Sequence, residues 1–151
     1  MKTVDTNAYV AVLRELIAEG REVSLLISGS SMEPFLKDQR DYICFKAPDR
    51  ELAAGDMVFY QRGNGQYIMH RIYKVEPEGY YLVGDHQVEI EGPLDRAQIF
   101  ALVTKVKRNG RWISPDDLTW KFFARLWPMT IPVRSFWGRV QRKLRRMHEE
   151  I

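Results

Sequence analysis

The sequence predicts a mainly β protein whose twisted antiparallel sheets form a partly open barrel or a sandwich. Six short segments between residues 22 and 108 are rich in Val, Ile, Tyr and Phe, and each is bounded by residues typical of turns. No helical pattern separates these segments, so a parallel sheet would lack its crossover helices. At 151 residues the chain suits one domain and an appendage, which we place at 1–117 and 118–151.

A short amphipathic helix is expected before the strands. The apolar residues at helical spacing are Tyr9, Val10, Leu13, Leu16 and Ile17. Thr6 or Asn7 provides a cap, and Gly20 provides a stop. The strand segments follow, and three of their connections have the composition of hairpin turns. The six segments are EVSLLIS, DYICFKA, DMVFYQR, QYIMHRIYKV, GYYLVGD and QIFALVTKVKR, and the three turns are RGNGQ, EPEG and RNGR.

The residues after Asp117 predict a helical appendage. Pro128 and Pro132 interrupt it, so we expect a short helix, a kinked link and a terminal helix from about Val133. One face of the terminal helix is apolar and the rest is basic. The apolar face comprises Val133, Phe136, Trp137, Val140, Leu144, Met147 and Ile151, and the basic residues are Arg134, Arg139, Arg142, Lys143, Arg145 and Arg146.

The charge distribution points to an anionic partner for this appendage. The net charge is +3, but residues 120–151 contain eight Lys or Arg against two Glu, whereas the first 119 residues contain 15 basic and 18 acidic residues. A basic amphipathic helix with Trp and Phe can lie on an anionic membrane surface. The alternative, equally supported, is that its apolar stripe packs on the domain. Nucleic acid ranks below lipid because no aromatic and basic strand motif of an RNA-binding domain is present.

Cysteine usage and hydropathy bound the compartment and the chemistry. Cys44 is the only cysteine, which excludes an internal disulfide, and its alternating segment predicts a buried structural thiol. We find neither a secretory leader nor a run of about 18 apolar residues, so we expect a cytoplasmic protein, peripherally bound to the membrane if the appendage contacts lipid. Three histidines and no phosphate-binding glycine loop imply no metal or organic cofactor.

The turn SGSSMEP could hold a reactive serine. Gly29 allows close approach of the backbone, and Pro34 prevents a long helix from following, so the hydroxyl of Ser30 or Ser31 would project from a fixed corner. A serine needs a neighbouring base to act as a nucleophile. Taken alone, the turn is explained more simply as a helix cap.

A base and a carboxylate follow the serine turn at a distance. His70 lies in the strand segment YIMHRIYKV, and histidine is the side chain best suited to accept a proton near neutral pH. Asp85 and Glu91 follow the strand GYYLV and could orient its imidazole. The alternatives are an ordinary strand histidine and an ordinary Gly-Asp turn. His86 and His148 are weaker candidates for the base.

The ordered motifs SGSSMEP, LAAGDMVFY, YIMHRI and GDH resemble the superfamily of serine peptidases that contains signal peptidase I and the self-cleaving repressor LexA. The resemblance covers residues 23 to about 113. It implies the fold of that superfamily and a serine endopeptidase with Ser31 as the nucleophile. His70 stands at the base position, as in the endoplasmic-reticulum type, and either Asp85 or Glu91 is the acidic partner. The resemblance also implies small substrate residues next to the scissile bond.

The oxyanion site departs from that of the bacterial signal peptidases. They have a hydroxyl two residues before the nucleophile, where this chain has Gly29. The amides of Ser30 and Ser31 would therefore bind the oxyanion, with the hydroxyls of Ser28 or Ser30 as helpers.

Three functions remain in view. The leading one is a serine endopeptidase that processes a peptide or protein precursor. The second is a LexA-like module that cleaves itself or a partner, although fewer than 30 residues precede the first strand and leave no room for a DNA-binding helix-turn-helix. The third is a non-catalytic module that its basic helix tethers to a membrane.

Overall fold

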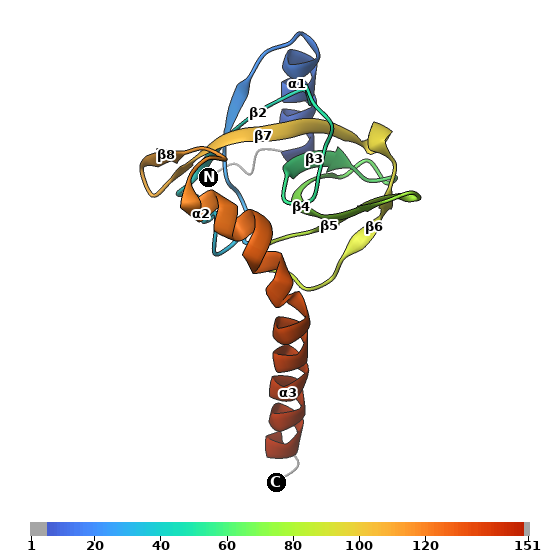
Figure 1. The fold of residues 1–151 in the computed structure, drawn as a ribbon, viewed down its shortest axis with the longest axis vertical. Coiled ribbons are helices and arrows are strands. Elements are labelled where there is room, and N and C mark those ends of the chain that lie inside the picture. Colours follow the sequence, from blue (N-terminus) through green and yellow to red (C-terminus); the bar gives the residue numbers. More distant parts are fainter. Residues whose placement is uncertain (1–5, 150–151) are drawn as a thin grey trace.

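The computed structural model describes residues 6–149 and confirms a mainly antiparallel β architecture with helices before and after the strands (Figure 1). The strands form one open sheet in the order β1-β2-β7-β3-β4-β5-β6, and β8 pairs with β7 outside this path. The strands are β1 (Val23–Leu26), β2 (Tyr42–Lys46), β3 (Met57–Gln61), β4 (Tyr67–Glu76), β5 (Gly79–Val83), β6 (Glu91–Leu94), β7 (Ile99–Arg108) and β8 (Arg111–Ile113).

All six predicted strands are present, and the three predicted turns form the hairpins β3-β4, β4-β5 and β7-β8. Strand β6 was not predicted, because Gly92 and Pro93 give it no alternating apolar pattern. It pairs with the outer edge of β5, with Glu91 opposite Leu82. This pairing brings Glu91 back beside the central strands.

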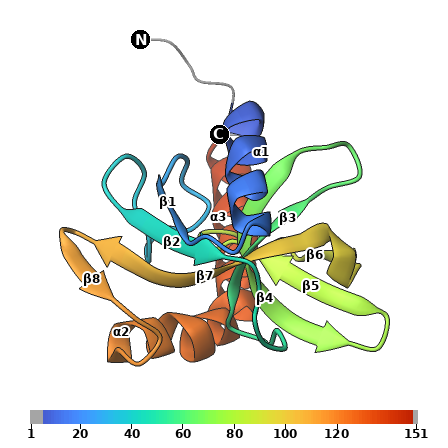
Figure 2. The same ribbon diagram turned by 90° about the horizontal axis from the view of Figure 1, so that it is seen from above.

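The strands alternate between two apolar clusters, as expected for a sheet buried on both faces. In β3, Met57 and Phe59 belong to one cluster and Val58 and Tyr60 to the other. Helix α1 (Thr6–Ala18) packs Leu13 and Ile17 on the first cluster, which also contains the buried side chains of the serine turn. Seen from above, the strands fan out on both sides of α1, with β1, β2 and β8 on one side and β3 to β6 on the other (Figure 2). The position of Cys44 in β2 confirms that its thiol is buried.

The appendage follows the predicted pattern of helix, kinked link and helix. It consists of α2 (Leu118–Lys121), the π-helical turn η2 (Phe122–Leu126), the 3-10 turn η3 (Trp127–Thr130) and α3 (Ile131–Glu149). Pro132 lies in the first turn of α3, where a proline costs no helical hydrogen bond. Trp120 and Phe123 pack against Phe35 of the serine turn, with ring centroids 5.7 Å and 4.9 Å apart. The first part of the appendage is therefore part of the domain core.

Helix α3 extends away from the body of the domain (Figure 1). Its apolar side chains are largely exposed, with 62% of Phe136 and 58% of Trp137 accessible to solvent. The stripe predicted along α3 therefore does not pack on the domain, which removes one of the two alternatives for this helix. Ile151, the last residue assigned to the stripe, lies outside the described residues. No helix within residues 6–149 is both long enough and apolar enough to cross a membrane.

Candidate active site

Arg71, which the sequence marks only as a charge beside His70, forms a buried ion pair with Asp85. Nitrogen atoms of its guanidinium donate to the two carboxylate oxygens of Asp85 at 2.8 Å each, and a third donates to the carbonyl oxygen of Gly55 at 2.9 Å. The Arg71 side chain is 0% exposed and that of Asp85 is 2% exposed. Both Gly-Asp motifs of the sequence, Gly55-Asp56 and Gly84-Asp85, are thus joined through one arginine.

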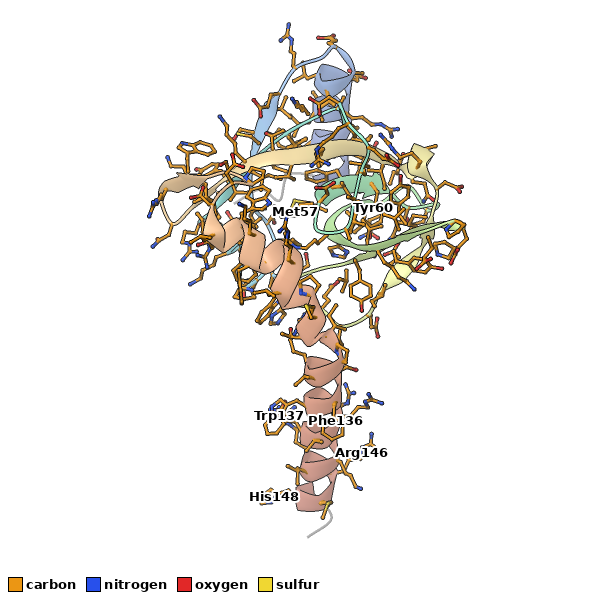
Figure 3. All side chains as sticks on the ribbon, in the orientation of Figure 1. Met57, Tyr60, Phe136, Trp137, Arg146 and His148 are labelled. Carbon is orange, nitrogen blue, oxygen red and sulfur yellow. The ribbon has the colours of Figure 1, made fainter. Side chains whose placement is uncertain are left out.

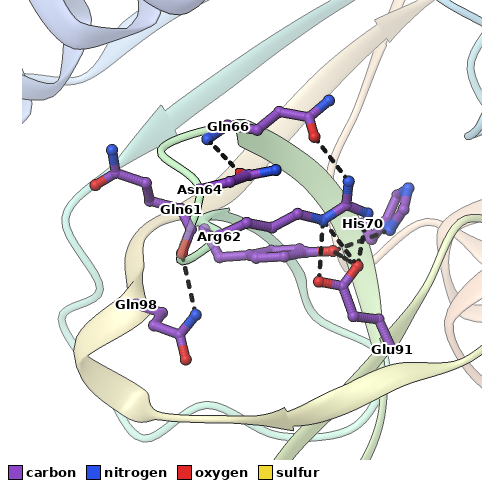
Figure 4. A network of polar contacts seen from close by, with 8 residues as sticks. Gln61, Arg62, Asn64, Gln66, His70, Glu91 and Gln98 are labelled. Carbon is purple, nitrogen blue, oxygen red and sulfur yellow. Dashed lines mark hydrogen bonds and ion pairs between the residues drawn. The ribbon is translucent and has the colours of Figure 1, made fainter.

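His70 points to the opposite face of β4, because successive side chains of a strand alternate. There its Nδ1 lies 3.3 Å from the hydroxyl oxygen of Tyr60 in β3. The Tyr60 hydroxyl donates to Oε1 of Glu91 at 3.0 Å, and the guanidinium of Arg62 donates to both carboxylate oxygens of Glu91 (Figure 4). A chain of polar contacts therefore runs from Arg62 through Glu91 and Tyr60 to the imidazole.

These polar contacts determine which ring nitrogen of His70 carries the proton. The hydrogen bonds from Arg62 and Tyr60 lower the pKa of Glu91, so its carboxylate is ionised and can only accept. The single proton of the Tyr60 hydroxyl is donated to that carboxylate, the stronger acceptor. Nδ1 of His70 must then carry a proton and donate it to the Tyr60 oxygen. The other nitrogen, Nε2, has a free lone pair and can accept a proton, as a general base requires.

Burial controls the protonation of this network. It lowers the pKa of His70 to about 4, although the negative charge of Glu91 opposes the effect, so the imidazole is neutral at pH 7. Burial and the charge of Glu91 together raise the pKa of Tyr60, which keeps its hydroxyl protonated. The network therefore keeps one proton on the Tyr60 hydroxyl and one on Nδ1 of His70, and these two protons fix the tautomer.

A cleft of about 550 Å³ opens beside the imidazole. His70 forms part of its wall, and the loop between β5 and β6 supplies most of the rest. His86, one of the weaker candidates for a base, lines this cleft, whereas His148 lies near the far end of α3, away from Tyr60 (Figure 3). The lining residues are Arg62, His70, His86, Gln87, Val88, Glu89, Ile90 and Glu91.

The serine turn is joined to the rim of this cleft through its backbone. The carbonyl oxygen of Ser31 accepts a hydrogen bond from the amide of His86 at 2.9 Å. Val83 pairs with Arg71, so the next residue, Gly84, comes level with His70, and any side chain at Gly84 would collide with the Ser31 carbonyl. Within residues 6–149, no hydrogen bond joins the Ser31 hydroxyl to His70. The connection between them runs through the Gly84 to His86 backbone.

The residues before Ser31 form an open turn. Gly29 adopts a φ of 93°, and its amide donates to Oδ1 of Asp38 at 2.8 Å, which fixes the corner. Ser28 and Ser30 are exposed. Among the described residues, the amides of Ser30 and Ser31 have no hydrogen-bond acceptor, so both remain free as donors. Gly29 does not contribute its amide, because Asp38 occupies it.

The structure separates the two carboxylates that the sequence left open as partners of His70. Asp85 uses both oxygens on Arg71, and within residues 6–149 no hydrogen bond joins it to His70. Glu91 reaches the imidazole through Tyr60 rather than directly. The carboxylate on the histidine side of the strand is therefore Glu91.

Three residues of this site were missed by the sequence reasoning. Arg71 could have been recognised from its neighbours, because a charged residue inside an apolar strand needs a buried partner. Tyr60 gave no signal, since tyrosine is common in strands. Arg62 lies in the predicted RGNGQ turn, and its pairing with Glu91 depends on the unpredicted strand β6.

The chain matches no protein-family model, and none of the curated proteins matches it significantly. Within the described part of the chain, no group of three or more His, Cys, Asp or Glu side chains converges as a metal site.

The Arg71-Asp85 pair should dominate the stability of the site. Removing one partner leaves a buried unpaired charge, so Asp85→Leu and Arg71→Met should each lower the free energy of unfolding by about 3–5 kcal/mol. The double variant should lose clearly less than the sum of the two. Urea unfolding at pH 7 measures all three, and additive losses would contradict the pairing. Asp49→Asn, in the exposed pair with Lys46, is the matched control and should change little.

The buried His70 should make stability depend on pH. Its pKa is about 4 in the folded protein and about 6.5 in the unfolded chain, so the unfolded state binds more protons between these values. The contribution of the neutral His70 to the free energy of unfolding is fully present above pH 6.5 and is lost as the pH falls toward 4. Between pH 7 and 4.5, wild type should lose about 2 kcal/mol more than His70→Gln. Parallel pH curves for the two proteins in urea unfolding would contradict the burial effect.

Proposed function

We propose that this protein is a serine endopeptidase of the signal-peptidase-like type, with Ser31 as the nucleophile and His70 as the general base. The observation that carries the proposal is the neutral, buried imidazole, whose Nδ1 is held by Tyr60 and which opens on a cleft beside the serine turn. A neutral histidine of fixed tautomer is what activation of a serine hydroxyl requires.

The fold is consistent with this assignment. The serine turn lies between β1 and β2, the base lies in the long strand β4, and two Gly-Asp turns meet that strand at one buried arginine. We assign the domain to the signal-peptidase-like fold on this order of elements. The sheet is open, with β1 and β6 at its ends, and we infer that it corresponds to the partly open barrel of that fold.

The Ser31 hydroxyl is expected to reach its catalytic position only when substrate binds. β5 pairs with β4 only from Arg71 onward, so the edge of β4 at His70 is open where the Ser31 carbonyl meets the His86 amide. Hydrogen bonds between a nucleophile and its base are often long in free enzymes and tighten when substrate binds. We infer that the Ser31 turn moves toward the cleft in the substrate complex and that its hydroxyl then reaches Nε2 of His70.

The reaction follows from these positions. The Ser31 oxygen attacks the carbonyl carbon of the scissile bond and its proton passes to Nε2 of His70, while the free amides of Ser30 and Ser31 stabilise the oxyanion. The imidazolium then gives this proton to the leaving nitrogen as the C–N bond breaks, which leaves an acyl-enzyme. Nε2 of His70 then deprotonates a water molecule, which hydrolyses the ester and restores Ser31.

Glu91 and Tyr60 act here as positioning residues. When His70 becomes an imidazolium, Nδ1 still donates to Tyr60, and the negative charge of Glu91 stabilises the positive ring. Arg62 keeps the Glu91 carboxylate in place. Glu91→Gln should slow the acylation of Ser31 without changing which residue is acylated, and it should slow this reaction less than His70→Gln.

Labelling with a serine-directed acylating probe tests the nucleophile. We expect one adduct, located on Ser31 by peptide mass mapping, because only a serine with a base is acylated rapidly. Ser31→Ala should abolish it, and His70→Gln should slow it by about 10²–10⁴-fold. Since the pKa of His70 is about 4, labelling should stay near its maximum down to about pH 5.

Ser24→Ala, at an exposed serine in β1, is the matched control and should label like wild type. Labelling that persists in Ser31→Ala, or that ignores His70→Gln, would refute the peptidase and favour a non-catalytic module. Folding of each variant is checked by its urea unfolding curve.

Gly84 should be required for the position of the serine turn. A methyl group there would collide with the Ser31 carbonyl, so Gly84→Ala should push the turn away from the cleft and lower the labelling rate at least about tenfold. Gly63→Ala is the matched control, because a side chain at Gly63 would meet no atom within 4 Å. Equal rates in the two variants would show that the Ser31 turn needs no contact with Gly84.

A further inference from the structure

The appendage has two apolar faces, and only one of them is covered. Its inner face packs on the domain core through Trp120 and Phe123, which are 6% and 7% exposed. Its outer face carries large apolar side chains, most of them three or four residues apart, and this spacing places neighbours side by side on a helical segment. This outer ridge consists of Leu118, Phe122, Leu126, Met129, Val133, Phe136, Trp137, Leu144 and Met147, all between 42% and 84% exposed.

A ridge of this length is unusual for the surface of a folded domain. Single exposed apolar residues are ordinary, but a contiguous apolar strip marks a surface that binds something. Phe136 and Trp137 protrude from the part of α3 that stands clear of the domain (Figure 3). Within residues 6–149, no other element covers this ridge, so its partner lies outside the described chain.

The positive charge of α3 distinguishes among three candidate partners: a second copy of the helix, duplex nucleic acid and an anionic bilayer. The remainder of α3 carries six Lys or Arg and one Glu, so two copies packed along their ridges would bring like charges together. Duplex nucleic acid would neutralise these charges but would leave the aromatic ridge exposed to water. The interface of an anionic bilayer satisfies both, because the acyl region accepts the apolar face and the phosphates accept the basic flanks.

We propose that the outer ridge of α2 to α3 docks the protein on a bilayer rich in anionic phospholipid, with α3 lying in the interface. This docking goes beyond the proposed peptidase function and does not depend on it. The aromatic residues lie at the base of α3, and the basic residues Arg139 to Arg146 follow along its length.

The docked helix is attached directly to the cleft. Nε1 of Trp127 donates to the carbonyl oxygen of Asp85 at 2.7 Å, and Arg134 donates to the same oxygen at 2.9 Å and to that of Gln87 at 3.2 Å. The Arg134 guanidinium also stacks on the Trp127 ring, 4.6 Å from its centroid. The loop that these contacts hold lines the His70 cleft, so docking of α3 fixes the cleft next to the bilayer.

Vesicle flotation of the full chain tests the proposal. The protein should float with vesicles of phosphatidylcholine and phosphatidylglycerol, bind vesicles of phosphatidylcholine alone much more weakly, and be released by high salt. The double variant Phe136→Ser/Trp137→Ser should bind the mixed vesicles at least about tenfold more weakly, because binding scales with buried apolar area. Both residues are exposed, so the variant should keep the unfolding curve of wild type.

Trp112→Ser is the matched control, because Trp112 is an exposed aromatic on β8 outside the ridge, and it should bind like wild type. Ser31→Ala should also bind like wild type, which separates this proposal from the peptidase. The proposal is overturned if wild type ignores anionic vesicles or if the double variant binds equally. It is also overturned if light scattering shows that the ridge forms a dimer instead, lost in the double variant, with no vesicle binding.

Discussion

The site depends on the buried pair of Arg71 and Asp85. Transfer of two charges from water is costly, and the cost is recovered only when every strong donor finds an acceptor. Each of the three guanidinium nitrogens of Arg71 makes one hydrogen bond, two to Asp85 and one to the Gly55 carbonyl, and the guanidinium lies 5.3 Å from the centre of the Phe35 ring. The pair therefore joins four segments that are distant in sequence: the serine turn, the turn before β3, the strand β4 and the loop after β5.

Two adjacent residues of β4 serve opposite faces of the sheet. Arg71 fixes the architecture on one face, and His70 faces the cleft on the other, beside Tyr60. This alternation also explains why the two carboxylates have different roles. Asp85 is on the side of the arginine, and Glu91 is on the side of the histidine, where its charge acts through the Tyr60 hydroxyl. A sheet buried on both faces can thus keep a rigid ion pair and a titratable network one residue apart.

Local pattern predicted the strands, the hairpins and the breaks in the appendage, because alternation, turn residues and proline act over a few residues. It did not predict β6, whose Gly92 and Pro93 lack any strand signal and which exists only because β5 offers an edge. The networks around Arg71 and His70 were hidden for the same reason. Their partners are 10 to 31 residues apart along the chain and meet only through strand pairing.

The appendage shows a different limit of sequence reasoning. Its terminal apolar stripe was correctly placed, but the choice between packing on the domain and contact with lipid assumed a single stripe. The π-helical and 3-10 turns around Pro128 let the segment present Trp120 and Phe123 inward while Leu126 and Met129 face outward. The appendage can therefore pack one apolar face on the domain and present another apolar face to lipid.

The attachment of α3 to the cleft loop is made entirely to main-chain oxygens. Trp127 and Arg134 bind the carbonyl groups of Asp85 and Gln87, and neither contacts a side chain of that loop by a hydrogen bond. The side chains from Gln87 to Ile90 that line the cleft are therefore free to vary without loosening the helix. Selectivity for a ligand in the cleft can evolve separately from the anchoring of the domain.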